Sequence, residues 1–384
     1  MLKLFIGFFV FCLVLFIYLH INFHFKTSDD LEVYEVDQVS KEKLEEICDL
    51  RQPVMFDFND ERLVSNTNME FLENNYHAFE MKIRNINDTD YENDIYLPLP
   101  LHSAVKLFND DKTSSFYSES NNELLQETGA IKTFQYNDEF LRPFMVSNCN
   151  YDVMSGSQNT QTPFRYELNY RNYFLVTSGS IKIKMAPPKS TKYLYTVYDY
   201  DNFEFRSPVN PWNPQAQYSA DFDKIKCLEV QLSAGKIIQV PAYWWYSIQF
   251  EKGASVSCLR YRTYMNNVAI SPYICLHALQ LQNVKRDITK KKEIVITDNS
   301  KNPDDPEKKV KETISKERKE QMINQQQSFD ATIIPKKDVD MRLGMDTKLN
   351  KDNMESDILS ANMNDGVSGV MPISSESITL GSSL

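Results

Sequence analysis

The stretch Leu228–Tyr261 constrains the fold most, because it reads as a series of short strands joined by tight turns. Apolar and polar residues alternate along Leu228–Leu232, which is the pattern of a half-buried strand. Ala234-Gly235 and Lys252-Gly253 are turn signals, and apolar runs lie between them. Several short strands with close turns predict an antiparallel sandwich or barrel.

The composition limits the class of protein. The chain has 384 residues, of which 42% are hydrophobic and 12% aromatic, so it can form a substantial core in one large or two small domains. A net charge of -11 argues against general nucleic-acid binding, which needs a basic surface. The six cysteines form no CxxC pair and the five histidines do not cluster, so a zinc site is not expected. Cysteine spacing leaves free thiols and a disulfide both open.

The N-terminus carries an apolar, uncharged segment, Leu4–Ile21. Spanning a bilayer takes about 20 such residues. A cleaved signal peptide is the alternative, but no small-residue cleavage pattern follows the segment. We therefore predict that residues 1–26 form a single transmembrane anchor, with the main domain in a lumen or outside the cell. The glycosylation acceptor Asn87-Asp88-Thr89 would be usable there.

The rest of the chain divides at about residue 284. Residues 27–284 hold the predicted strands and, near their end, an apolar helix over Ser271–Val284. Residues 285–384 begin with mixed charge and become polar and poor in aromatics, which predicts a largely disordered tail. A partner-binding role for this tail remains open.

Four landmarks of the central region occur in the order seen in one known family. They are Arg51–Phe56, then Thr162-Pro163 with Asn172, Gly179 and Pro187-Pro188, then Ser207–Pro214, and finally Ala234-Gly235 with Val240–Trp245. Together they resemble the JmjC and cupin-like hydroxylases, specifically the cupin-8, asparaginyl-hydroxylase-like 2-oxoglutarate oxygenases. The resemblance covers roughly residues 35 to 282. It implies a mainly β fold with flanking helices, built as a double-stranded β-helix.

The family's chemistry needs two histidines and one carboxylate on Fe(II), with open positions for 2-oxoglutarate and O₂. The resemblance places Arg165 and Tyr246 at the histidine positions and Glu167 at the carboxylate position. The lysine that holds 2-oxoglutarate in the family is replaced by Ile181. The iron ligands and the cosubstrate lysine are therefore lost, while the packing landmarks are kept.

Counting back from Asn172 instead shifts the first two positions to Tyr166 and Leu168, and this register supplies no histidine either. Arg165 is a permanent cation and cannot ligate a metal. We expect it to pair with Glu167, two residues along on the same strand face. We expect the Tyr246 ring to fill the former metal space, with its hydroxyl bonded to Glu167 or Arg165.

Aromatic and amide residues near these positions are candidates for lining a pocket. The candidates are Tyr166, Asn172, Trp212, Trp244 and Trp245. The two neighbouring tryptophans are predicted to be core and rim aromatics. An aromatic-rich insert would either line a groove or cover the barrel mouth, and it contains Tyr193, Tyr195, Tyr198, Tyr200 and Trp212.

Three functions follow from these observations. The first is a membrane-anchored, catalytically degenerate domain that needs no cofactor and binds an unknown protein or small molecule. The second is an active protein hydroxylase using Fe(II) and 2-oxoglutarate, with Glu167 and histidines from elsewhere, such as His102 or His277. The third is an unrelated β-sandwich ectodomain.

Overall fold

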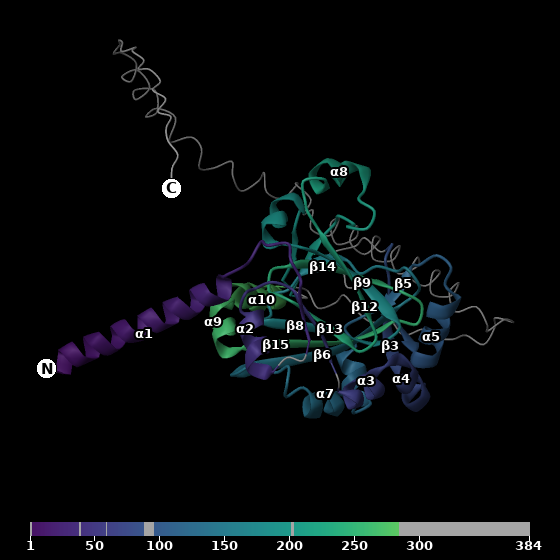
Figure 1. Cartoon of the computed structure of the whole chain (residues 1–384), viewed down its shortest axis with the longest axis horizontal. Helices are drawn as coiled ribbons and strands as arrows, with labels where there is room; N and C mark the ends of the chain where they lie inside the picture. Colours follow the sequence, from purple (N-terminus) through teal and green to yellow (C-terminus); the bar gives the residue numbers. More distant parts are fainter. Residues whose placement is uncertain (1, 38–39, 59, 88–95, 201–202, 284–384) are drawn as a thin grey trace, which may run out of the picture. The chain divides into compact units, whose positions relative to one another are not determined.

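The computed structural model describes residues 2–37, 40–58, 60–87, 96–200 and 203–283 (Figure 1). The predicted tail, residues 285–384, lies outside the described residues. So do two of the three residues of the glycosylation acceptor, Asp88 and Thr89.

Two β-sheets form the centre of the described structure. The nine-stranded sheet has the order β1 (Tyr34–Val36), β2 (Val54–Asp57), β13 (Lys236–Val240), β8 (Arg171–Ser178), β15 (Ser255–Thr263), β6 (Val146–Gly156), β5 (Phe116–Ser118), β3 (Glu80–Asn85), β4 (Leu97–Pro100). The six-stranded sheet has the order β10 (Val197–Asp199), β11 (Glu204–Ser207), β7 (Phe164–Tyr166), β14 (Trp245–Phe250), β9 (Ser180–Ala186), β12 (Leu228–Ser233).

Consecutive strands pass from one sheet to the other. β7, β8 and β9 alternate between the sheets, and so do β12, β13, β14 and β15. Strands of the first series pair antiparallel with strands of the second: β8 pairs with β13 and β15, and β9 pairs with β12 and β14. The mainly β architecture with flanking helices that was predicted from the sequence is therefore confirmed. The short strands expected within Leu228–Tyr261 are present as β12, β13, β14 and β15.

The apolar faces of the two sheets meet in a shared core, and β9 shows how the sequence produces it. Ile181, Ile183 and Met185 are buried, whereas Lys182 and Lys184 between them are only partly buried. Because successive side chains of a strand point to opposite faces, this alternation buries one face and wets the other. Fully burying a side chain of this size contributes about 1.5–3 kcal/mol.

Short helices cover the other face of the nine-stranded sheet and form a second apolar cluster with it. They are α2 (Lys41–Cys48), α3 (Glu61–Thr67), α4 (Met69–Tyr76), α5 (Leu101–Asp110), α6 (Asn122–Glu127) and α7 (Ile131–Asn137). Helices α3, α4 and α7 lie together on this side (Figure 1). The Ser40 side chain caps α2 by accepting a hydrogen bond from the Lys43 amide, which explains where this helix begins.

The remaining helices lie outside this group. They are α1 (Leu2–Phe25), the 3₁₀ helix η1 (Pro188–Tyr193), α8 (Ala216–Phe222), α9 (Tyr264–Ala269) and α10 (Ser271–Asn283). Lys3–Phe25 is long and apolar enough to cross a membrane, and a signal sequence near an N-terminus has the same length and composition. The helix is therefore a candidate membrane span.

One prediction of local structure was wrong. The polar stretch from Asn109 to Asn122 reads as a loop, but it contains β5. Phe116 and Tyr117 in this strand are buried, and β5 pairs with both β3 and β6. Tertiary packing of two aromatic residues therefore overrides the polar flanks.

Two glycines with positive φ provide a matched test of the β8–β9 turn. A Cβ on Gly179 (φ +64°) would lie 2.9 Å from the Ala254 Cα, whereas one on Gly235 (φ +86°) would meet nothing within 4 Å. Gly235→Ala should lower the free energy of unfolding by about 1 kcal/mol through backbone strain alone. Gly179→Ala should cost about 2–3 kcal/mol because a backbone clash is added. Chemical denaturation of both variants checks this, and equal losses would contradict the close approach.

Candidate functional site

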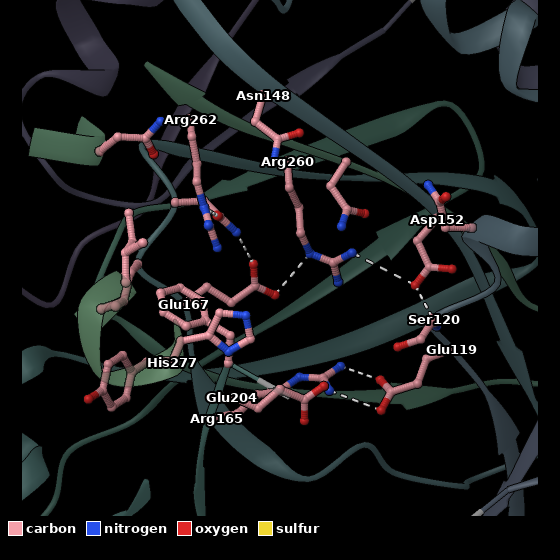
Figure 2. Close-up of a pocket in the computed structure, with 18 residues that line it drawn as sticks. Glu119, Ser120, Asn148, Asp152, Arg165, Glu167, Glu204, Arg260, Arg262 and His277 are labelled. Atoms are coloured by element: carbon pink, nitrogen blue, oxygen red, sulfur yellow. Dashed lines mark hydrogen bonds and ion pairs between the residues drawn. The ribbon is translucent and has the colours of Figure 1, made fainter. Parts of the chain in front are cut away.

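A cavity of about 540 Å³ lies where the two sheets and the C-terminal helices meet (Figure 2). Its lining comes from β6 and β15 of the large sheet, from β7 and the chain after it, and from α9 and α10. The segment that follows β5 closes one side with Glu119 and Ser120. The lining is mostly polar and contains both arginines and carboxylates.

One wall of the cavity is a polar stripe on two neighbouring strands. On β6 the stripe contains Asn148, Asn150 and Asp152, and on β15 it contains Arg260 and Arg262. Asn148 pairs in register with Arg262, and Asn150 with Arg260. Residues two apart on a strand share a face, so the two arginines project into the cavity side by side (Figure 2).

Glu167 lies at the centre of the cavity and accepts three hydrogen bonds. The Tyr246 hydroxyl donates to its Oε1 at 2.5 Å, and Arg260 Nε donates to the same oxygen at 2.9 Å. The Asn169 side-chain amide donates to Oε2 at 2.6 Å. The structure thus contains the predicted hydrogen bond between Tyr246 and Glu167.

The charges around Glu167 keep it ionised. Burial opposes the charged form, but Arg260 and the Tyr246 hydrogen bond outweigh it and lower the pKa of Glu167. Burial, together with the charge of Glu167, raises the pKa of Tyr246. The phenol therefore keeps its proton and donates a hydrogen bond to the carboxylate.

Arg165 does not pair with Glu167, which corrects the sequence-based expectation. Its Nη1 donates to Glu119 Oε1 at 3.0 Å and its Nη2 to the other oxygen of the same carboxylate. Strand β7 ends at Tyr166, so Glu167 does not continue the strand face on which Arg165 lies. The Arg165 guanidinium also lies 5.7 Å from the centre of the Tyr246 ring.

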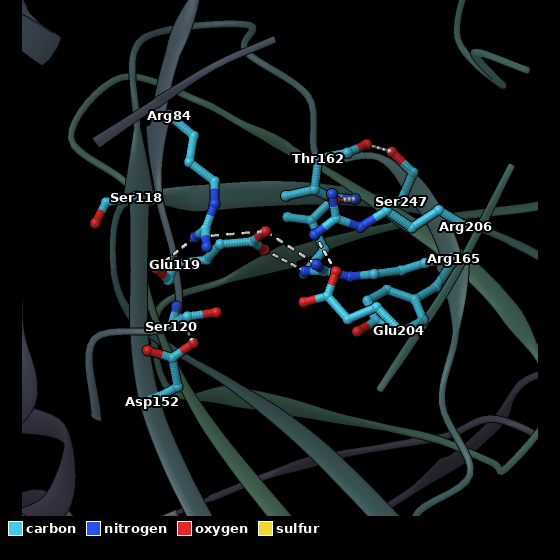
Figure 3. A network of polar contacts seen from close by, with 12 residues as sticks. Arg84, Ser118, Glu119, Ser120, Asp152, Thr162, Arg165, Glu204, Arg206 and Ser247 are labelled. Atoms are coloured by element: carbon cyan, nitrogen blue, oxygen red, sulfur yellow. Dashed lines mark hydrogen bonds and ion pairs between the residues drawn. The ribbon is translucent and has the colours of Figure 1, made fainter. Parts of the chain in front are cut away.

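Glu119 is the hub of a buried ion-pair network (Figure 3). It is 1% exposed and lies between Arg165 and Arg84, whose Nη1 is 3.8 Å from Glu119 Oε1. Burial alone would raise the pKa of Glu119, but the charges of Arg165 and Arg84 lower it to about 2. Arg206 forms a further ion pair with Glu204 at the edge of the network.

Five residues were predicted to line a pocket, and the structure brings only Tyr166 to this cavity. Trp244 and Trp245 are fully buried, and their indole N–H groups donate to the Arg51 carbonyl and the Thr191 hydroxyl. The Trp212 indole N–H donates to the Ser247 hydroxyl, and the Lys184 ammonium lies 4.7 Å from the centre of the Trp212 ring. These tryptophans therefore pack the barrel.

The fifth candidate, Asn172, and the former cosubstrate position, Ile181, also lie outside the lining. Asn172 donates to the Val240 carbonyl and accepts a hydrogen bond from Asn169. Ile181 lies in the core between the sheets, paired in register with Leu232 and Phe250.

The aromatic insert packs mainly against itself. The rings of Tyr198 and Tyr200 stack with centroids 6.2 Å apart, and both meet the Phe205 ring edge-on. The Tyr195 ring contacts the Tyr218 ring in a tilted arrangement, with centroids 5.0 Å apart. This packing is that of a cover over the six-stranded sheet.

The two histidines considered as alternative ligands lie in different places. His102 on α5 is exposed and bonds the His77 carbonyl at 3.0 Å. His277 on α10 lines the cavity, but its Nδ1 is bonded to the Tyr200 carbonyl. Within the described ranges, no group of three or more histidine, cysteine, aspartate or glutamate side chains is placed to hold a metal ion.

The donor set around Glu167 does not fit Fe(II). The guanidinium of Arg165 offers no lone pair and carries a positive charge toward the site. Tyr246 remains a protonated phenol that donates to Glu167. The Glu167 oxygens are already occupied by three donors.

Sequence reasoning missed Glu119, Asp152, Arg260 and Arg262. A signal for three of them was present, because Asn148, Asn150 and Asp152 alternate with less polar residues, and Arg260 and Arg262 flank Tyr261. Two polar period-2 stripes on predicted neighbouring strands point to a wet internal face. No comparable signal marks Glu119.

Comparisons with known proteins bear on the whole domain. A family model described as a cupin-like domain matches residues 24–266. The chain is 28% identical over 103 residues to HSPB1-associated protein 1 from Rattus norvegicus, which is 27% of this chain and 22% of that protein. The proteins of the same name from Mus musculus and Homo sapiens are also 28% identical over 103 residues, 27% of this chain and 21% of each relative. The match thus spans about a fifth of each relative's own length.

Proposed function

This chain belongs to the cupin-like domain family, and we propose that it is a catalytically degenerate member that binds a ligand or protein partner in its cavity instead of hydroxylating one. Family membership removes the alternative of an unrelated β-sandwich. It leaves open what the cavity does, and the chemistry of its lining supports a binding role.

The observation that carries the proposal is the bonding of Glu167. In the family, the carboxylate at this position would face a metal ion; here it faces the Tyr246 hydroxyl and the Arg260 guanidinium, with Arg165 beyond Tyr246. A divalent cation entering this place would have to displace two donors from the carboxylate and approach arginines of the same sign. Like charges at short range disfavour that strongly.

The cavity nevertheless has the features of a binding site. Its volume lies within the range of small-molecule pockets, and fixed arginine, asparagine and carboxylate groups converge on it. The relatives are named for an association with another protein, HSPB1, which supports a protein segment as one kind of occupant. A small molecule of the same chemistry is the other kind.

We extend the proposal to location. Helix α1 would hold the domain at a membrane, with the N-terminus in the cytosol and the domain in a lumen or outside, because its length and composition suit a span. Protease protection of the full chain in microsomes tests this: a protected domain is the expected result. Release of a shortened, soluble domain would show that the segment is a signal sequence instead.

Measurements of iron binding and of 2-oxoglutarate turnover test the proposal that the domain is not catalytic. The full chain, purified in detergent, should bind no Fe(II) at micromolar concentration under anaerobic titration, and it should form no succinate from 2-oxoglutarate in air. An active 2-oxoglutarate oxygenase assayed in the same detergent is the positive control. Stoichiometric iron binding with succinate formation would establish the active-hydroxylase alternative.

A further inference from the structure

We propose that the cavity contains a carboxylate-binding subsite centred on Arg262, which pairs with a singly charged carboxylate group of the ligand. The inference rests on the proposed binding function and specifies the chemical class that the cavity takes. Four observations support it: charge balance, geometry, burial and neighbouring donors.

The first observation is the charge balance of the cavity and its supporting network. The carboxylates are Glu119, Asp152, Glu167 and Glu204, and the arginines are Arg84, Arg165, Arg206, Arg260 and Arg262. Each of the first four arginines lies within ion-pair distance of one of these carboxylates. Arg262 has no carboxylate at that distance among the residues that the structure describes.

The second observation is the way Arg262 is held. Its Nε donates to the Asn169 side-chain oxygen at 2.6 Å, and its guanidinium lies over the Phe203 ring at 4.7 Å from the centre. These contacts fix the plane of the guanidinium. Its two terminal amino groups form no hydrogen bond to any described residue, so they present an open edge to the cavity.

The third observation is burial. Burial lowers the pKa of Arg262, and the charge of Glu167, which is itself paired with Arg260, counteracts this only in part. The guanidinium stays charged, as arginine does in proteins. An incoming anion would therefore find a cation that is partly desolvated and not yet neutralised, which strengthens the pair relative to one at the surface.

The fourth observation is a second donor beside the arginine. Asn148 pairs in register with Arg262 on the neighbouring strand and lines the same cavity. Its side-chain amide forms no hydrogen bond to another described side chain or backbone group. A carboxylate seated on the guanidinium edge would have this amide on the neighbouring strand as a further donor.

Charge decides between a carboxylate and a phosphate. Arg262 alone offers its charge to a ligand, since it has no carboxylate at ion-pair distance among the described residues, and the Glu167 carboxylate lies between the two guanidinium groups of β15 (Figure 2). A doubly charged phosphate would bring a second negative charge next to Glu167 without a cation to offset it. The planar guanidinium edge matches a carboxylate through two parallel hydrogen bonds. The favoured ligand group is therefore a carboxylate.

The experiment compares a carboxylate with its neutral isostere. The full chain in detergent is titrated with propionate and with propionamide in buffer that contains EDTA, with saturation-transfer NMR as the readout. Propionate should bind at least about tenfold more tightly, because a hydrogen-bonded charge pair is worth about 1.5–3 kcal/mol. Equal binding of the two compounds would overturn the proposal.

Variants locate the subsite. Arg262→Gln should reduce propionate affinity to the propionamide level. Arg262→Lys should retain part of the preference, because lysine keeps the positive charge but lacks the planar guanidinium that forms two parallel hydrogen bonds. Arg62→Gln, on the exposed surface of α3, is the matched control and should leave the preference unchanged. An unchanged preference in folded Arg262→Gln, verified by its thermal unfolding, would refute the assignment.

Two tripeptides distinguish the sources of the carboxylate. Acetyl-Gly-Glu-Gly-amide and its glutamine analogue present the group as a protein side chain would. A glutamate preference that Arg262→Gln removes supports a protein segment, whereas a preference confined to propionate supports a small molecule. Since EDTA excludes iron, this result is independent of the turnover assay, so failure of the carboxylate subsite can be told apart from failure of the proposed lack of catalysis.

Discussion

Glu119→Gln will lower the free energy of unfolding by about 4 kcal/mol, the largest effect expected from a single polar substitution in this domain. The carboxylate is 1% exposed and forms ion pairs with two arginines, Arg165 and Arg84, which are themselves buried. Removing one partner of a buried ion pair leaves uncompensated charge in the interior, which typically costs 3–5 kcal/mol. Chemical denaturation of the full chain in detergent measures the loss.

Glu123→Gln is the matched control. Glu123 lies four residues along the chain, and its side chain is 71% exposed while pairing with Lys82 at 3.2 Å. An exposed ion pair contributes little, so the loss should stay below about 1 kcal/mol. Similar losses in the two variants would show that Glu119 is not the centre of a buried network.

The pH dependence of stability follows from the same group. Because the pKa of Glu119 is lowered from 4.5 to about 2 in the folded state, its contribution is fully present above about pH 4.5. It is lost progressively as the pH falls through about 2. The wild-type chain should therefore lose stability more steeply than Glu119→Gln between these pH values, and unfolding midpoints across that window measure the difference.

The second large effect on stability is expected at Arg260, and it distinguishes this arginine from Arg262 on the same strand. Arg260→Gln should lower the free energy of unfolding by about 3 kcal/mol, because Glu167 and the 3% exposed Asp152 then lose their shared cation. Arg262→Gln should cost about 1 kcal/mol, the value of its hydrogen bond to Asn169. Thermal and chemical unfolding of the two variants under identical conditions measure both losses.

This contrast tests whether the two arginines have different roles in the cavity. If Arg260 is a structural ion and Arg262 is free for a ligand, their effects on stability must differ by the stated margin. A large loss for Arg262→Gln would mean that the chain itself neutralises this arginine, which would also contradict the carboxylate subsite.

Much of the fold could be predicted from the sequence because its strands are amphipathic. The alternation from Leu228 to Leu232 predicted β12 correctly, and it also identified the side chains that this strand turns away from solvent. The bond between Tyr246 and Glu167 could be predicted because the family resemblance placed both residues at one point of the barrel.

The ion-pair network could not be predicted. Glu119 and Arg165 are 46 residues apart and meet only because β5 adds to the edge of β6. Strand β5 is three residues long and lies in a polar stretch, so neither the periodicity nor the composition of the sequence predicts this strand. Ion pairing between distant elements depends on which strand edges meet, and local sequence carries no record of that.

The site on β15 was missed for a different reason. The stretch in which strands were predicted ends at Tyr261, but β15 continues to Thr263. The two added residues include Arg262, so the sequence pattern placed only one arginine inside the sheet. A polar face needs at least two members before its period can be recognised.

Strand β15 is hydrogen-bonded on both sides, to β6 and to β8, for most of its length. Arg260 lies in this doubly paired part, whereas Arg262 lies just beyond it and pairs with Asn148 of β6 alone, so both residues sit on a strand that is paired before any ligand arrives. A ligand that meets such a surface spends little of its interaction energy on ordering the protein. Differences in affinity among carboxylate ligands should then arise mainly in their dissociation rates, while their association rates stay similar.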